Sequence, residues 1–249
     1  MPRYFLEVSY KGTCYSGFQA QHNANTVQAE VENAFKILQK DSIIMTGSSR
    51  TDAGVHALQN FFHFDYDENV HTQFVYKMNA VLPKDIVIKK LIPVHPSSHC
   101  RFDAIGRVYK YYIYNHKNPF LQERAFYFPF KIDIDKLKQA SEIIKAYEDF
   151  RSFSKRKTQV KNFYCKIAVS EWVFENDCLV YNVEANRFLR GMVRALVATM
   201  LKVARGKLSI AEFQRIIEAK DCTKVSFAVP ANGLFLFGIN YPFEYFDLE

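Results

Sequence analysis

The sequence lacks any run of 18 apolar residues, the length that a helix needs to cross a membrane. Its first segment, MPRYFLEVSYKG, alternates like a strand and carries charges where a signal peptide would have an apolar centre. These absences predict a folded protein of the cytoplasm with no membrane partner. With 249 residues, of which 49% are hydrophobic, the chain can bury one large core or two small ones.

Motifs for metal ions and nucleotide cofactors are also missing. The five cysteines are widely scattered without a CxxC pair, which favours reduced thiols over disulfides or a structural zinc site. The seven histidines form no HxH, HExxH or Cys/His cluster, and no GxGxxG or GxxxxGK stretch is present. The sequence therefore predicts chemistry by carboxylate, arginine and tyrosine side chains, with no metal and no cofactor.

Positive charge, by contrast, is in excess. The net charge is +7 and the isoelectric point is near 9.0. Summed surface charge governs association, so an anionic partner such as a nucleic acid is plausible.

The hydrophobic periodicity predicts the order β-α-β-β-α-β twice. In the first half we expect strands at 3–10, 42–48, 59–66 and 85–94, and helices from Val27, behind a Thr26 cap, and at 71–82. In the second half we expect strands at 107–115, 163–175, 178–186 and 233–241. The expected helices there are one with Leu137, Ala140, Ile144 and Tyr147 facing inward, one at 188–204 and one at 209–219.

This order predicts an α+β fold with mixed α/β elements. It consists of two ferredoxin-like β-α-β-β-α-β halves, residues 1–105 and 106–249, in a continuous, mainly antiparallel sheet. The helices cover one face of the sheet, and a basic cleft lies at the centre.

The first candidate site is the stretch TGSSRTDAGVHAL, residues 46–58, where Arg50 and Asp52 lie two residues apart at a turn. Such a pair is most often an Asx-type turn with a solvated arginine. In a cleft, however, a carboxylate loses hydration and needs a cation nearby to stay charged. His56 lies close by, but no serine or cysteine joins it as a nucleophile, so we expect a structural role.

Candidate cations follow in EANRFLRGMVRALVATMLKVARG. On one helical wheel its four arginines lie within about 60° of one another: Arg187, Arg190, Arg194 and Arg205. A solvated basic face is the ordinary interpretation. Arg187 and Arg190 would lie at the helix N-terminus, where the helix dipole disfavours cations, and this favours a functional role.

Aromatic and basic residues also alternate in RFDAIGRVYKYYIYN. Strand geometry puts Arg107 and Tyr109 on one face and Lys110 on the other. Tyrosines in strands usually pack, but tyrosine among arginine and lysine also holds unstacked bases and their phosphates. The loop SKRKTQVK, with Lys155, Arg156 and Lys157, either grips phosphates or is solvated.

Six segments together resemble the tRNA pseudouridine synthase A family over nearly the whole chain, and the second is the most specific: SYKGTCYSGFQAQ, SSRTDAGVHAL, RFDAIGRVYKYYIYN, EDFRSFSK, NRFLRGMVRALV and GLFLFGINYP. The resemblance implies isomerisation of uridine to pseudouridine in the tRNA anticodon stem-loop, at positions 38–40, by a homodimer without a cofactor.

The resemblance also implies the residue roles. Asp52 would be the catalytic aspartate, acting as nucleophile or as initiating base, and Arg50 would displace the target base. Tyr109 would stack on the uracil, Arg194 would pair with the aspartate, and Leu234 would pack beside it. Tentative tRNA contacts are Arg107, Lys110, Lys155, Arg156, Lys157, Arg187 and Arg190.

Two positions depart from the family pattern, which usually has glycine where Ser49 stands and tryptophan where Phe18 stands. A rearranged turn or an altered choice of uridine would follow from them. Two other functions remain open: a non-catalytic RNA-binding protein with the same fold, and a glycoside hydrolase. The hydrolase would need a second acid within about 5 to 10 Å, and the sequence nominates none near Asp52.

Overall fold

The computed structural model describes residues 1–67, 70–156, 160, 162–243 and 245–246. The chain forms two compact units, Met1–Ile105 with Phe235–Glu249, and Gly106–Leu234. The last segment of the chain, which the periodicity assigns to the second half, thus groups with the first unit. The division into domains 1–105 and 106–249 stays a prediction.

The sheet of the first unit is built on β1 (Arg3–Tyr10), which pairs antiparallel with β3 (His56–Asp65) and with β4 (Ile86–Val94). The short strand β2 (Thr46–Gly47) continues the sheet beside β3. At its other end β3 also pairs in parallel with β9 (Leu234–Asn240), through His56 with Phe235 and Ala57 with Leu236. The residues just before β3 therefore lie close to β3 itself, to the end of β1 and to β9.

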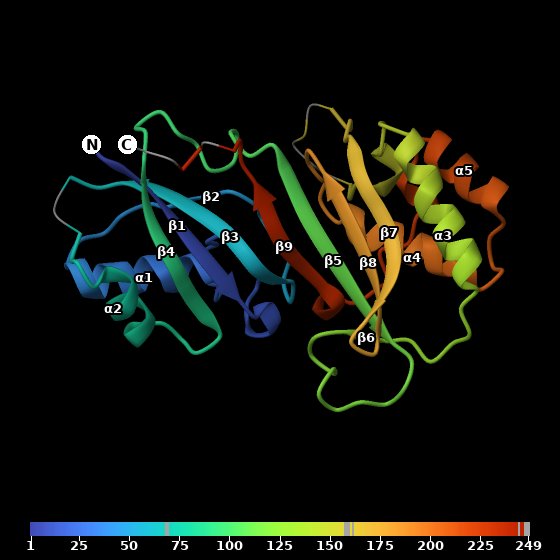
Figure 1. The fold of residues 1–249 in the computed structure, drawn as a ribbon, viewed down its shortest axis with the longest axis horizontal. Coiled ribbons are helices and arrows are strands. Elements are labelled where there is room, and N and C mark those ends of the chain that lie inside the picture. Colours follow the sequence, from blue (N-terminus) through green and yellow to red (C-terminus); the bar gives the residue numbers. More distant parts are fainter. Residues whose placement is uncertain (68–69, 157–159, 161, 244, 247–249) are drawn as a thin grey trace. The chain divides into compact units, whose positions relative to one another are not determined.

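Two helices, α1 (Val27–Gln39) and α2 (Phe74–Val81), lie side by side against this sheet (Figure 1). The buried ring of Phe35 in α1 packs edge-on against Phe64 of β3 and against Phe74 of α2. The predicted Thr26 cap is confirmed, since its side chain accepts a hydrogen bond from the backbone N–H of Ala29 at 3.3 Å.

The second unit has β8 (Cys178–Ala185) between β5 (Gly106–Tyr114) and β7 (Ile167–Glu175), antiparallel to both, while β6 (Phe126–Tyr127) pairs in parallel with β5. Asn176 and Asp177 have φ of 46° and 64°, as a two-residue hairpin turn requires. The helices are α3 (Ile134–Ile143), α4 (Met192–Ala204) and α5 (Ile210–Glu218).

Short 3-10 helices complete the structure at Gly12–Cys14, Ile144–Ala146, Arg151–Phe153, Cys222–Lys224 and Ala231–Gly233. The predicted mixed fold with mainly antiparallel strands is confirmed. Among the described residues no helix is long and apolar enough to cross a membrane.

Three local predictions need correction. The strand expected over 42–48 shrinks to Thr46–Gly47. The helix expected from residue 188 begins at Met192, because Gly191 has a φ of 75° and so interrupts the helical backbone. Tyr147 is half-buried rather than inward, since α3 ends at Ile143, and its hydroxyl donates to Glu218 at 2.8 Å.

Candidate active site

Arg50 and Asp52 lie in the irregular segment between β2 and β3. The backbone N–H of Val55 donates to the carbonyl oxygen of Asp52 at 3.1 Å, and Gly54 has a φ of 77°. Asp52 therefore opens a tight turn that needs the left-handed conformation of glycine. Arg50 is exposed and Asp52 half-buried, whereas Ser49 and Thr51 are buried.

The buried residues of this segment are held from several sides. The side-chain amide of Asn60, in β3, donates to the carbonyl oxygen of Ser49 at 2.8 Å. The hydroxyls of Tyr10 and Thr51 are 2.8 Å apart, and the backbone N–H of Phe18 donates to the Thr51 carbonyl oxygen at 3.2 Å. Because Ser49 and Thr51 face the interior, Arg50 and Asp52 are left at the surface of the segment.

The loop that follows β1 packs directly against the turn. A Cβ atom on Gly12 would overlap the carbonyl oxygen of Val55, so only glycine fits there. The backbone N–H of Gly12 donates to Nδ1 of His56 at 3.0 Å, and the His56 ring lies 4.5 Å from the ring of Phe235. His56 is 1% exposed and joins two segments, which supports the structural role expected for it.

The two departures from the family pattern cause no visible strain. Ser49 does not have a positive φ, so its backbone conformation does not require glycine. Phe18 is buried and stacks on Phe62 with ring centroids 4.6 Å apart. Both residues belong to the packing that supports the turn.

The predicted residues of the second unit lie on regular elements. Tyr109, in β5, is 9% exposed, and the edge of its ring contacts Phe188 at a centroid distance of 5.0 Å. Arg194 lies in the first turn of α4, where Nε and Nη2 donate to the carbonyl oxygen of Val229 at 2.9 and 2.7 Å. These bonds fix the plane of the guanidinium group. Leu234 is buried at the start of β9.

The shared helical face predicted for four arginines is wrong. Only Arg194 lies within α4, whereas Arg187 and Arg190 precede the helix because it begins after Gly191. Arg205 caps its C-terminal end, with the guanidinium carbon 3.8 Å from the ring centroid of Phe130.

The tentative tRNA contacts have varied surroundings. Arg107 donates to the carbonyl oxygen of Asn186 at 2.9 Å, and Arg187 donates to Asn162 at 3.1 Å. Lys110 forms an ion pair with Glu175 at 2.8 Å. Arg156 and Arg190 are exposed and Lys155 is half-buried, while Lys157 lies outside the described residues.

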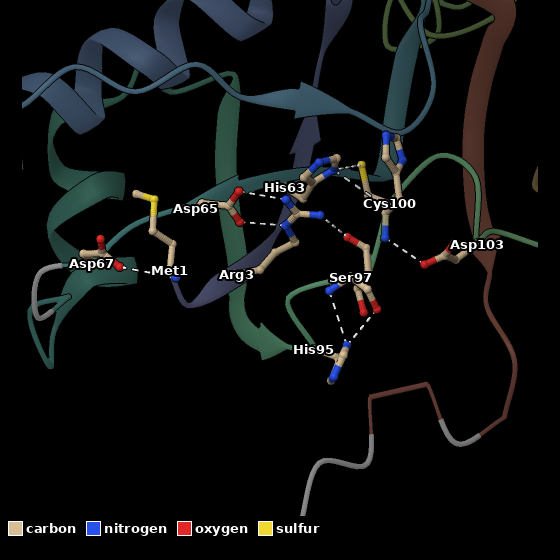
Figure 2. A network of polar contacts seen from close by, with 11 residues as sticks. Met1, Arg3, His63, Asp65, Asp67, His95, Ser97, Cys100 and Asp103 are labelled. Carbon is tan, nitrogen blue, oxygen red and sulfur yellow. Dashed lines mark hydrogen bonds and ion pairs between the residues drawn. The ribbon is translucent and has the colours of Figure 1, made fainter.

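One group of metal-ligand type occurs among the described residues, although no sequence motif indicated it, and Figure 2 labels two of its members, His63 and Cys100. Ligand atoms of His63, His99 and Cys100 lie within 4.8 Å of one another. The signal in the sequence was the adjacent pair His99 and Cys100. The expectation that cysteine and histidine do not cluster is therefore wrong.

The protein itself already engages these ligand atoms. The Cys100 thiol donates to the carbonyl oxygen of Thr46 at 3.2 Å, and Nδ1 of His99 accepts from the backbone N–H of Arg101 at 3.2 Å. Burial lowers the pKa of His63 to about 4, and the Arg3 guanidinium nearby adds to that effect. Since the thiol and the imidazole are already bonded within the protein, we interpret the cluster as a polar network that supports the core.

The chain is similar to known proteins over nearly its whole length. The model of a family described as tRNA pseudouridine synthase matches residues 7–103 and 147–242. A tRNA pseudouridine synthase A of Parabacteroides distasonis is 43% identical over 251 residues, with 100% of both chains covered. One from Bacteroides fragilis is 43% identical, with 98% of each chain covered. One from Staphylococcus aureus is 36% identical, covering 94% of this chain and 89% of its own.

Proposed function

Because the chain belongs to the tRNA pseudouridine synthase family, a family of isomerases, we propose that it converts uridines 38–40 of the tRNA anticodon stem-loop to pseudouridine with Asp52 as the catalytic residue. The bond between N1 and the ribose carbon C1′ breaks, and C5 bonds to C1′ instead. The proton on C5 goes to solvent, and N1 takes up a proton.

This reaction is balanced without a cofactor. Uridine and pseudouridine are isomers, so no oxidant, reductant or group donor is consumed. What the reaction needs is a group that starts it and an environment that holds the detached base. Asp52 starts it, either as a nucleophile or as a base, and the other site residues hold the base.

Each remaining site residue has a role in this proposal. Arg50 displaces the target base from its stack, and Tyr109 stacks on the extruded uracil. Arg194 pairs with the carboxylate of Asp52 and keeps it ionised, while Leu234 packs beside it. The bonds from Arg194 to the Val229 carbonyl support this role, since they orient the guanidinium group before substrate binds.

Binding of the tRNA depends on phosphate contacts, which supply most of the affinity and little of the sequence selectivity. We assign these contacts to the excess positive charge of the chain. We also propose that the protein is a homodimer and that one tRNA contacts both subunits. The residues assigned to these contacts are Arg107, Lys110, Lys155, Arg156, Lys157, Arg187 and Arg190.

The observation that carries the proposal is the anchored segment around Asp52. Its buried neighbours Ser49 and Thr51 are bonded to the core, while Arg50 and Asp52 remain accessible. The core thus fixes the backbone that carries Arg50 and Asp52, and it leaves their side chains within reach of a substrate.

The test is the isosteric variant Asp52→Asn. With tRNA carrying tritium at C5 of uridine, we expect the wild-type protein to release tritium and the variant to release none. The Kd for tRNA should change by less than about threefold, because phosphate contacts dominate binding. Tritium release by the variant at the wild-type rate would refute the role of Asp52.

A further inference from the structure

The buried side chain of Asn60 is bonded to the backbone of Ser49 in both directions. Its Nδ2 donates to the Ser49 carbonyl oxygen at 2.8 Å, and the Ser49 N–H donates to its Oδ1 at 3.3 Å. Oδ1 also accepts from the backbone N–H of Phe61 at 2.9 Å. The carboxamide thus pairs with the N–H and the C=O of one residue, as a neighbouring strand would.

Through Tyr10, the same carboxamide is also connected to Thr51, the residue that follows Arg50 in the chain. Nδ2 of Asn60 lies 3.4 Å from the hydroxyl of Tyr10, which is 2.8 Å from Oγ1 of Thr51. Ser49, Thr51, Tyr10 and Asn60 are buried, with Asn60 0% exposed. One side chain therefore connects Ser49 and Thr51, and Asp52 directly follows Thr51.

We propose that Asn60 is a positioning residue that sets the backbone course of residues 49–52 and hence the orientation of Arg50 and Asp52. This inference rests on the proposed role of Asp52. Without the carboxamide, the carbonyl and N–H of Ser49 lose their buried partners, so the segment shifts to find others. A displacement of about 1 Å at a reacting group can lower a rate by roughly 100-fold.

The chain offers a control with the same hydrogen-bond pattern in Asn79, an exposed residue of α2. Its Nδ2 donates to the carbonyl oxygen of Ile88 at 2.8 Å, and the Ile88 N–H donates to its Oδ1 at 2.8 Å. This is the same reciprocal pairing between a carboxamide and a peptide group. Ile88 belongs to β4, so loss of this pairing does not touch the segment 49–52.

The experiment compares Asn60→Ala with Asn79→Ala in single-turnover tritium release from tRNA. Thermal unfolding is measured beside it, and both variants are assayed below their melting temperatures. We expect Asn60→Ala to lower the rate constant by roughly 10- to 100-fold while the Kd for tRNA stays within about twofold. Asn79→Ala should keep the wild-type rate.

A second pair of variants separates positioning from general loss of stability. Asn60→Asp keeps an acceptor for the Ser49 N–H but places a carboxylate against the Ser49 carbonyl oxygen. Protonation of that carboxylate restores a donor, and burial favours the protonated form. The rate of Asn60→Asp relative to wild type should therefore rise as the pH is lowered, while the ratio for Asn79→Asp stays flat.

Two outcomes would overturn the inference: equal rates for Asn60→Ala and Asn79→Ala, or a pH-independent ratio for Asn60→Asp. The proposed function would survive either one, provided that Asp52→Asn is inactive. An active Asp52→Asn variant would instead remove the basis of both.

Discussion

Asp52 and Arg50 lie in an irregular segment of the first unit, whereas Tyr109 and Arg194 lie within a strand and a helix of the second. The irregular segment is held by side chains that bond its backbone and by glycines that let the chain approach closely. Tyr109 and Arg194 are placed by the regular backbone hydrogen bonding of a strand and a helix. Packing against Phe188 and the bonds to the Val229 carbonyl oxygen only orient their side chains. An irregular segment should therefore be more sensitive to substitutions outside the site.

The glycine that abuts the turn should affect both the stability and the rate. Gly12→Ala should displace the Val55 carbonyl oxygen, which lies three residues after Asp52. We expect a loss of about 1 to 3 kcal/mol in the free energy of unfolding. The rate of pseudouridine formation should fall by roughly 100-fold. Urea unfolding and tritium release measure the two.

Gly238→Ala is the control, since a Cβ there would meet only the Gln59 side chain at an ordinary 3.7 Å. It should leave both quantities near wild type. If Gly12→Ala behaves like Gly238→Ala, the irregular segment tolerates backbone displacement, and the contrast between the units disappears.

The guanidinium of Arg194 gives the next effect. Arg194→Lys keeps the positive charge but cannot reproduce the planar pair of bonds to the Val229 carbonyl. We expect a loss of roughly 10- to 100-fold in kcat with little change in melting temperature. Arg205→Lys, at the other end of α4, should change kcat by less than about twofold. Equal activity of the two variants would mean that charge alone suffices at position 194.

The ring of Tyr109 tests packing in the second unit. Stacking of a base on an aromatic ring contributes roughly 1 to 3 kcal/mol. Tyr109→Ala should therefore slow single turnover by roughly 5- to 150-fold. Tyr109→Phe keeps the contact with Phe188 and should stay within about threefold of wild type. A phenylalanine variant as slow as the alanine variant would show that the hydroxyl, not the ring, is needed.

The polar network of His63, His99 and Cys100 in the first unit predicts that the stability depends on pH. It predicts no such effect on the reaction rate. Because burial lowers the pKa of His63 to about 4 from 6.5, the unfolded state binds its proton more readily than the folded state. Stability should therefore fall as the pH drops from 6.5 toward 4. His63→Gln should reduce this loss by about 1 to 3 kcal/mol in urea unfolding across that range.

The exposed His95 supplies the control, since His95→Gln should retain the wild-type pH dependence. An unchanged acid response in His63→Gln would mean that this imidazole titrates as it would in water. In that case burial of His63 would not account for the acid response of the first unit.

Periodicity predicted the strand Arg3–Tyr10 and the Thr26 cap because both signals are local. Periodicity gave the wrong start for α4, because the positive φ of Gly191 interrupts the helical backbone and the helix begins only at Met192. The turn residues Arg50 and Asp52 could be found from their motif. Asn60 could not, because its partner Ser49 lies 11 residues earlier, beyond the reach of helix or strand periodicity, and an asparagine within a strand carries no periodic signal.

The most direct test of the account maps pseudouridine at single-nucleotide resolution in unmodified tRNA transcripts treated with purified protein. Wild-type protein should produce pseudouridine at positions 38–40, and Asp52→Asn, which keeps the size and shape of the side chain, should produce none. Pseudouridine at those positions after treatment with Asp52→Asn would contradict the central role given to this carboxylate.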